Sequence, residues 1–352
     1  MSDHVRAALA TIVEGGTLDL DEARLAMGAV MDGEATPAQL AALLMGLRMR
    51  GETVDELAGF ATAMRERVVR VEAPEGTIDV VGTGGDGSGT FNISTASALV
   101  IAAAGIPVAK HGNRAITSKS GSADVLDALG IRIDHDALSA SKALGEAGFA
   151  FLFAPLFHPA MRHAAPTRRE IGVRTAFNLL GPLTNPAGTT RQLLGVADAR
   201  AAGRFAEVVH RLGTERTLVV HGAGVDELPL DGTGELYEVT PDGVEHRFVD
   251  AVALGLRATA TSRLAGGDAA ANARYVEAIL RGEPGSRRDV VLLNAGAAFL
   301  AAGAVESIED GIERAALTID AGLTAQLLDR LRDERRRADA AKPPVDSAGS
   351  TP

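Results

Sequence analysis

The amino-acid sequence predicts an α/β protein with an N-terminal α-helical subdomain and a larger α/β domain built on a mainly parallel central sheet. Two observations carry this prediction. The first 72 residues contain helix start signals only, whereas short apolar runs alternate with helical stretches from residue 77 onward. A chain of 352 residues with 46% hydrophobic residues has room for one large domain and a smaller one.

Three capping boxes mark helix starts in the N-terminal region. In a capping box, the N-cap side chain and the side chain three residues later each accept the other residue's backbone N–H. The three pairs, each ahead of a periodic apolar run, are Asp19–Glu22, Thr36–Gln39 and Thr53–Glu56. We therefore assign residues 1–72 to the helical subdomain, and expect helices from about 160–185 to join it.

Six short apolar runs are expected to form strands, and the α/β domain is assigned to residues 73–333. The runs are TIDVV at 77–81, IPVA at 106–109, FAFLFA at 149–154, LLGVA at 193–197, TLVVH at 217–221 and VVLLN at 290–294. Residues around 236–249 alternate like an antiparallel hairpin whose turn is Pro-Asp-Gly at 241–243. Residues 334–352 lose apolar periodicity, which predicts a disordered tail.

Composition excludes several classes of protein. The net charge of −11, from 35 basic and 46 acidic residues, argues against a nucleic-acid partner, because such binding depends on basic residues that neutralise phosphates. The absence of cysteine removes disulfides and thiolate metal sites, and favours a cytoplasmic location. The N-terminus lacks a signal-peptide pattern, and no apolar stretch approaches the ~20 residues of a membrane span.

A glycine-rich segment, GTGGDGSGT at 82–90, follows the first expected strand and precedes an expected helix. Backbone N–H groups of such a turn and of the helix start bind phosphate oxygens well, although a plain flexible turn is the alternative. The segment also fits the GxGxxG pattern of dinucleotide-binding proteins. That function needs an acidic residue about 20 positions further on, and neither Asp nor Glu occurs between Asp86 and Asp124. The sequence therefore favours a phosphate site without a dinucleotide.

Basic residues follow the second expected strand, in Lys110-His111-Gly112-Asn113-Arg114, and Lys119 comes soon after. Two of the four lysines of the chain thus lie in one acid-free window. We expect an anionic ligand here, at the ends of parallel strands where α/β proteins bind ligands; a solvated loop is the alternative. Ser122 could bind a phosphate or simply cap the helix that follows.

An acidic pair, Asp226 and Glu227, follows the expected strand TLVVH in a glycine-containing loop. Magnesium prefers carboxylate oxygens and often shares phosphate ligands, so together with the glycine-rich segment the pair predicts a magnesium–pyrophosphate substrate. The histidines lack zinc-site spacing, and no GxSxG motif is present. Catalysis by positioning and charge stabilisation, without a covalent enzyme intermediate, is therefore expected.

Seven strings, in this order, resemble the anthranilate phosphoribosyltransferase family: GTGGD at 82–86, NIST at 92–95, KHGNR at 110–114, SGSADVLDALG at 120–130, FLFAPLFHPAM at 151–161, REIGVRTAFNLLGPLTNP at 169–186 and the Asp-Glu pair. The resemblance extends from the helical start to about residue 330. It implies a fold similar to class II nucleoside phosphorylases, usually a homodimer, with the active site between the subdomains. It also implies a magnesium-dependent step of tryptophan biosynthesis, in which anthranilate and phosphoribosyl pyrophosphate (PRPP) give phosphoribosylanthranilate and pyrophosphate.

The resemblance implies the following site residues. For PRPP they are Gly82, Gly85, Asp86, Thr90, Asn92, Ile93, Ser94, Thr95, Lys110, His111, Gly112, Asn113, Arg114, Ala115, Ile116, Thr117, Ser118 and Ser122. For magnesium they are Ser94, Asp226 and Glu227. For anthranilate they are Gly82, Asn113 and Arg168, of which Arg168 would pair with the carboxylate. No catalytic acid or base is expected, because an aromatic amine needs little deprotonation before it attacks.

Two other functions fit the same fold: a nucleoside phosphorylase, and a nucleic-acid-binding relative without activity. KHGNR and the Asp-Glu pair favour the transferase over the phosphorylase, and the net charge of −11 argues against the nucleic-acid-binding relative. Stabilisation by PRPP with magnesium would separate these functions, since a ligand that binds only the native state raises its melting temperature.

Overall fold

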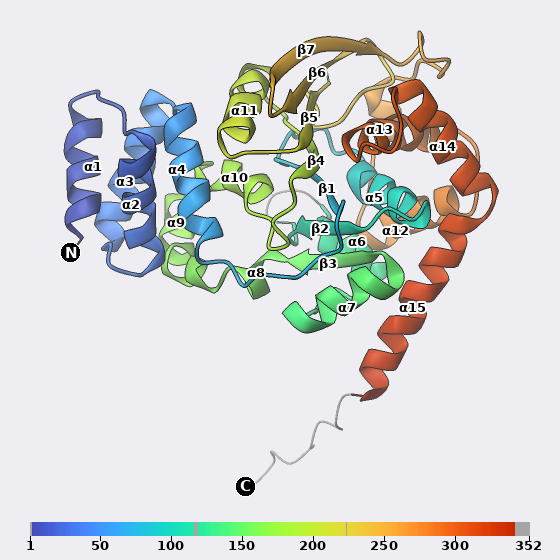
Figure 1. The fold of residues 1–352 in the computed structure, drawn as a ribbon, viewed down its shortest axis with the longest axis horizontal. Coiled ribbons are helices and arrows are strands. Elements are labelled where there is room, and N and C mark those ends of the chain that lie inside the picture. Colours follow the sequence, from blue (N-terminus) through green and yellow to red (C-terminus); the bar gives the residue numbers. More distant parts are fainter. Residues whose placement is uncertain (1, 116–118, 223, 342–352) are drawn as a thin grey trace, which may run out of the picture.

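The computed structural model describes residues 2–115, 119–222 and 224–341. Four helices form the N-terminal bundle: α1 (Asp3–Val13), α2 (Leu20–Met31), α3 (Pro37–Arg50) and α4 (Val54–Arg65) (Figure 1). All three predicted capping boxes are formed. Later segments extend the bundle: η1 (Pro159–His163) contacts α2, α9 (Ala165–Ile171) contacts α3, and α10 (Phe177–Leu180) contacts α4.

A seven-stranded sheet lies at the centre of the larger domain. Its strands are β1 (Ile78–Gly82), β2 (Val108–Gly112), β3 (Phe149–Phe153), β4 (Arg191–Gly195), β5 (Arg216–His221), β6 (Thr233–Thr240) and β7 (Gly243–Asp250). The order is β3-β2-β1-β4-β5-β6-β7; the first five strands are parallel, and β6 and β7 are antiparallel. The mainly parallel sheet and the hairpin, which closes at Thr240 and Gly243, are confirmed.

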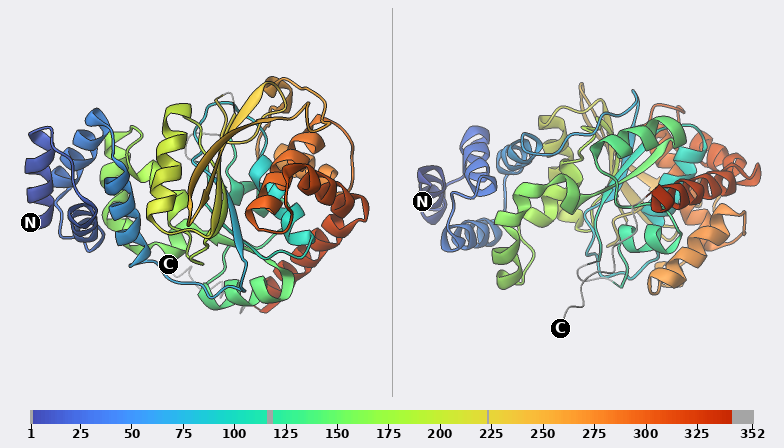
Figure 2. Two further views of the ribbon diagram at one scale, coloured as in Figure 1. Left: turned by 45° about the horizontal axis from the view of Figure 1, so that its top comes forward. Right: turned by 90° about the horizontal axis from the view of Figure 1, so that it is seen from below.

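Helices cover both faces of the sheet. On one face, a core that includes Val80, Phe151 and Leu218 packs against α5 (Ile93–Ala103), α6 (Ser122–Ala128), α12 (Ala269–Leu280), α13 (Ser286–Ala301), α14 (Ile308–Asp320) and α15 (Leu323–Ala341). On the other face, α11 (Ala199–Arg211) and the helical bundle share a core with β4 and β5, and α7 (Ala137–Ala147) packs on β3. Helix α11 therefore lies between the sheet and the bundle (Figure 2).

The short segments complete the described structure. Helix α8 (Ala154–Phe157) follows β3, η2 (Gly181–Leu183) follows α10, and η3 (Thr261–Leu264) follows the β6–β7 hairpin. In the described part of the chain, no helix combines the length and the apolar character needed to cross a membrane.

The expected strand at 290–294 was wrong, because these residues lie inside helix α13. Every residue of α13 from Val290 to Ala301 is buried, since α5 and α14 and the strands β4 and β5 all pack against it. A helix that is covered on all sides has no polar face, so a short apolar run cannot distinguish it from a buried strand.

The expected disordered tail was also wrong for residues 334–341, which continue helix α15; residues 342–352 lie outside the described part. Arginines anchor this helix where apolar residues run out. Arg332 donates to Glu277 at 2.8 and 3.0 Å, and Arg335 lies 2.8 Å from Asp127 and donates to the carbonyl of Ile131. Charged contacts to the domain thus extend the helix beyond its apolar stripe.

Candidate active site

The strand order reverses between β1 and β4, the place where open parallel sheets bind ligands at their carboxyl ends. The glycine loop, residues 83–90, leads from this edge into α5. Four of its residues have positive φ: Gly84, Gly85, Gly87 and Gly89. The side chain of Asn92, the N-cap of α5, contacts Ser120 and Asn272 and does not cap the helix. The first turn of α5 therefore has no side-chain cap, which suits an anionic ligand.

Three carboxylates, which we call the acid cluster, meet beside this loop. Asp86, Asp226 and Glu227 each bring one oxygen within 4.8 Å of the others. Asp226 Oδ2 accepts the backbone N–H of Gly84 at 2.8 Å. Oε2 of Glu227 is buried and finds no hydrogen-bond partner in the described part of the chain. This donor set suits a divalent cation such as magnesium. The sequence pointed to Asp226 and Glu227 as ligands; only the fold adds Asp86.

Burial and mutual repulsion both raise the pKa values of Asp226 and Glu227. Burial, and then the charge of Asp86, raises the pKa of Asp226. Burial, and then the charges of Asp226 and Asp86, holds the pKa of Glu227 well above its usual range. A bound cation would relieve both effects, because it compensates the charge of the carboxylates directly.

Two glycines make room for Asp226 at the strand ends. Gly82 and Gly195 are paired on β1 and β4. A Cβ on Gly82 would lie 2.2 Å from Asp226 Oδ2, and one on Gly195 would lie 1.7 Å from the carbonyl oxygen of Asp226. Gly82, predicted as a substrate contact, is therefore also required for the packing of the acid cluster.

The sequence placed Lys110 after the second expected strand, but the structure places it within strand β2. Its side chain is only 2% exposed, and Nζ donates to the carbonyl of Val80 at 2.5 Å and lies 3.4 Å from Ser94 Oγ. Burial lowers its pKa to about 8, and Asp79, Glu227 and Asp226 oppose that effect. Lys110 is therefore a mostly charged, buried cation between the start of α5 and the acid cluster.

Asp79, which sequence reasoning missed, supports this region from inside β1. It is fully buried, accepts the backbone N–H of His111 at 3.2 Å and accepts Nδ2 of Asn185 at 2.7 Å. Burial raises its pKa to about 6, opposed chiefly by Lys110. The available signal was a charged residue inside the apolar run TIDVV.

Two neutral histidines lie beside β2. The rings of His111 and His158 are 5.1 Å apart, and Nδ1 of His111 lies 3.0 Å from the carbonyl of Gly181. Burial lowers the pKa of His111 to about 3 and that of His158 to about 4. Nε2 of each ring is buried and has no partner within the described ranges. Sequence reasoning assigned no role to His158, and its place beside His111 depends on the fold.

The segment after β2 is less cationic than its sequence suggests. Arg114 pairs with Asp124 at 2.8 Å and with Asp127 at 3.5 Å. Asp124 Oδ2 also accepts the N–H of Ala115, and Ser122 Oγ donates to the carbonyl of Asn113 at 3.4 Å. Helix α6 thus neutralises the arginine of the acid-free window. The expected residues Ile116, Thr117 and Ser118 lie outside the described residues.

Arg168 lies on α9, at the edge of the helical bundle. Its guanidinium is 4.9 Å from the centre of the Phe177 ring, and burial alone lowers its pKa. No carboxylate among the described residues forms an ion pair with it, so its charge is available to a ligand.

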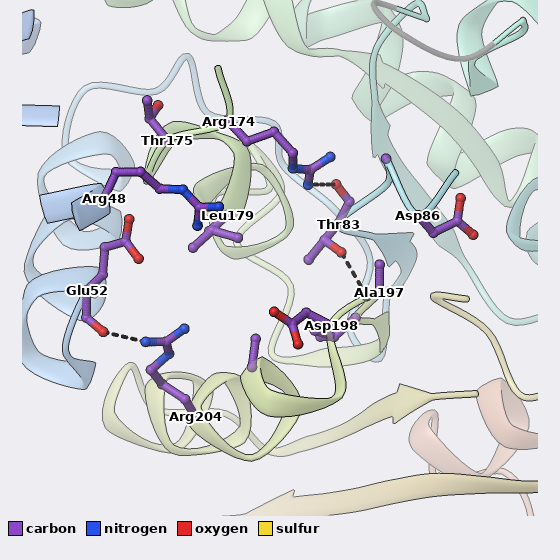
Figure 3. A pocket seen from close by; sticks show the side chains of 13 residues that line it. Arg48, Glu52, Thr83, Asp86, Arg174, Thr175, Leu179, Ala197, Asp198 and Arg204 are labelled. Atoms are coloured by element: carbon purple, nitrogen blue, oxygen red, sulfur yellow. Dashed lines mark hydrogen bonds between the residues drawn. The ribbon is translucent and has the colours of Figure 1, made fainter. Parts of the chain in front are cut away.

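A cleft of about 290 Å³ lies between part of the bundle and the larger domain (Figure 3). Thr83, Gly85 and Asp86 of the glycine loop line one side. The other lining residues are Arg48, Glu52, Arg174, Thr175, Leu179, Val196, Ala197, Asp198, Ala201 and Arg204. Neither Asn113 nor Arg168 lines this cleft. Its arginines were missed because nothing in the sequence distinguishes them from the other arginines of the chain.

Comparison with known proteins supports the sequence resemblance. Residues 6–68 match the glycosyl transferase family, helical bundle domain, and residues 74–325 match the glycosyl transferase family, a/b domain. The chain is 48% identical to an anthranilate phosphoribosyltransferase of Azorhizobium caulinodans, over 98% of this chain and 100% of that one. It is 51% identical to one of Thermomicrobium roseum, over 93% and 96%.

Solved structures agree with these matches. Anthranilate phosphoribosyltransferase from Thermus thermophilus is 43% identical, covers 95% of this chain and 100% of its own, and superposes with a TM-score of 0.88. The Saccharomyces cerevisiae enzyme in complex with PRPP and Mg is 25% identical, covers 96% and 99%, and gives a TM-score of 0.86. The fold, the site and these matches together place this chain in the anthranilate phosphoribosyltransferase family.

Proposed function

We propose that this chain transfers the phosphoribosyl group of PRPP to anthranilate, giving N-(5-phosphoribosyl)anthranilate and pyrophosphate. The observation that carries the proposal is the meeting of the glycine loop and the acid cluster at the ends of β1 and β4. The glycine loop supplies N–H groups for phosphate oxygens, and the acid cluster supplies ligands for the magnesium that accompanies a pyrophosphate.

The donor site consists of the glycine loop, the start of α5 and the segment after β2. In this proposal Ser94, Asp226, Glu227 and the additional Asp86 hold Mg²⁺. When bound, Mg²⁺ would neutralise the charge that develops on the departing pyrophosphate. Lys110 places a second positive charge beside Ser94. The PRPP contacts expected from the resemblance complete the site: Gly82, Gly85, Thr90, Asn92, Ile93, Thr95, and residues 111–118 and 122.

The acceptor site centres on Arg168, with Gly82 and Asn113. A guanidinium that pairs with no carboxylate of the described ranges suits the anthranilate carboxylate, because its fork of N–H donors matches the two oxygens. The adjacent Phe177 offers an apolar surface near the same group. Neutral His111 and His158 add no charge that would compete for the carboxylate.

The reaction forms a C–N bond and breaks a C–O bond at the anomeric carbon. The amine of anthranilate attacks the face opposite the departing pyrophosphate, and the ribosyl ring passes through an oxocarbenium-like state. The amine loses its proton after the bond forms, so the chain needs no strong base. Its residues act by alignment and by charge stabilisation.

Loss of anthranilate fluorescence with PRPP and Mg²⁺ tests this proposal. We expect magnesium-dependent turnover that collapses in the double variant Asp226→Asn/Glu227→Gln and persists in the control Arg169→Ala, an exposed neighbour on α9. Absence of turnover by folded protein that still binds PRPP would mean that the donor site is right and the acceptor is a different amine.

We further propose that the chain acts in the cytoplasm as a homodimer. The absence of cysteine suits a reducing compartment. Light scattering after size exclusion should give twice the 36.2 kDa of one chain; a mass of 36.2 kDa at assay concentration would contradict the dimer.

A further inference from the structure

Arg174 bridges the bundle-side wall of the cleft and the glycine loop (Figure 3). Its guanidinium lies against Gly85: a Cβ on that glycine would be 1.6 Å from Arg174 Nη1. Nη2 donates to the carbonyl of Thr83 at 3.4 Å. Gly85 is therefore required both for its positive φ and for the space that the arginine occupies.

The tip of the loop has little other support. Its ends are anchored: Thr83 N–H donates to Gly195, Gly84 N–H to Asp226, and the carbonyl of Gly89 accepts Gly266 N–H. In the described part of the chain, the backbone of residues 85–87 forms no hydrogen bond with another segment. With four left-handed glycines, the loop has many accessible conformations when unsupported. Arg174 is thus the side chain placed to restrict them.

The base of Arg174 is itself held firmly. The next residue, Thr175, is only 4% exposed, and its N–H donates to Asn178 Oδ1 at 3.0 Å at the start of α10. The same short segment begins at Gly172, which ends helix α9, the helix of Arg168. One short stretch of chain therefore carries both arginines, one toward each proposed substrate site.

We infer that Arg174 is a positioning residue that holds the glycine loop in the conformation that binds the donor. This inference rests on the proposed function, in which the loop binds the phosphates of PRPP. Arg174 acts on the loop before any ligand arrives, which separates its role from that of a direct phosphate ligand.

Hydrogen exchange of the ligand-free protein tests the inference without substrate. In Arg174→Ala, the amides of Thr83 and Gly84 should exchange about tenfold faster than in the parent chain, since a lost contact of modest strength changes a local opening equilibrium by that order. Arg174→Lys, which can still donate to Thr83, should recover part of the protection. Arg169→Ala should match the parent chain. Unchanged exchange in folded Arg174→Ala would overturn the inference, whatever its activity.

Kinetics supply the second measurement. Arg174→Ala should raise KM for PRPP about tenfold while kcat at saturating donor changes less than about twofold, because loop ordering is a cost of binding. Arg174→Lys should bring the KM for PRPP back toward the value of the parent chain. An equal fall in kcat with unchanged KM would contradict a positioning role. If anthranilate is not the acceptor, the exchange experiment still decides the role of Arg174, so the two failures remain distinguishable.

Discussion

Glu227→Gln should stabilise the ligand-free protein while it abolishes magnesium binding. The carboxylates of the acid cluster lie within 4.8 Å of one another, and two unit charges at that distance repel by about 3 kcal/mol at an effective dielectric constant of about 20. Partial protonation already relieves some of this repulsion, so we expect a gain of about 1–2 kcal/mol in the free energy of unfolding. For a chain of 352 residues, that corresponds to about 1–3 °C in melting temperature.

The gain should depend on pH. The pKa of Glu227 is raised in the folded state above its ordinary value of 4.5, so the folded protein binds this proton more tightly than the unfolded chain does. The associated stability is present below pH 4.5 and is lost as pH rises through the folded pKa. Glutamine cannot ionise, so the variant should exceed the parent chain at about pH 8 and approach it near about pH 5.

Differential scanning fluorimetry at about pH 5 and about pH 8, with and without Mg²⁺ and PRPP, measures both effects. The parent chain should gain several degrees from the ligand pair, since a ligand at about 100 times its dissociation constant contributes about 2.7 kcal/mol. The melting temperature of Glu227→Gln should not rise when Mg²⁺ and PRPP are added. The exposed Glu283→Gln is the matched control and should follow the parent chain. A melting temperature several degrees lower at the higher pH, with ligand stabilisation intact, would refute the electrostatic argument.

Three further predictions concern other parts of the molecule. Arg168→Ala should raise KM for anthranilate about tenfold or more, because a charged hydrogen bond is lost, and leave KM for PRPP near its parent value. Steady-state kinetics with each substrate varied measures both constants, and a raised KM for PRPP with an unchanged KM for anthranilate would contradict the prediction. Gly82→Ala should destabilise the protein by about 1–3 kcal/mol in urea unfolding, because its Cβ would overlap Asp226; an unchanged midpoint would show that this carboxylate moves freely. Arg332→Ala should reduce stability more above pH 4.5 than below pH 2, because this arginine is the main cause that lowers the pKa of Glu277 to about 2, whereas its hydrogen bond to the carbonyl of Leu129 is lost at every pH; an equal loss of stability in both pH ranges would contradict the role of the ion pair.

Local sequence signals predicted the N-terminal half of the fold well. The three capping boxes depend on side chains three residues apart, so their prediction needed no tertiary information. The parallel strands before residue 221 were also found, because apolar runs of four to six residues bounded by glycine or polar residues are typical of buried strands. The errors came where burial is complete, in α13, and where charge alone extends a helix, in α15.

The chemistry of the candidate site was visible in the sequence in part. Glycine-rich, basic and acidic segments each follow an expected strand, and the topology of a parallel sheet gathers strand ends at one edge. The sequence could not reveal that Asp86 joins the acid cluster, that helix α6 neutralises Arg114, or that Arg174 lies on Gly85. These contacts join residues that lie ten or more positions apart in the chain, beyond the few residues over which local patterns act.

Sequence alone therefore determined the fold class, the family resemblance and the residue types available for phosphate and magnesium. Helix caps are set by interactions within a few residues, and buried strands are marked by short apolar runs, so both are visible locally. Tertiary structure alone decided which charges remain available to ligands. Among the residues that the structure describes, Arg114 is paired, Arg168 is not, and three acids share one small volume. The reason is physical: the energy of a charge depends on its partners and its exposure to water, and both are fixed only when distant segments pack together.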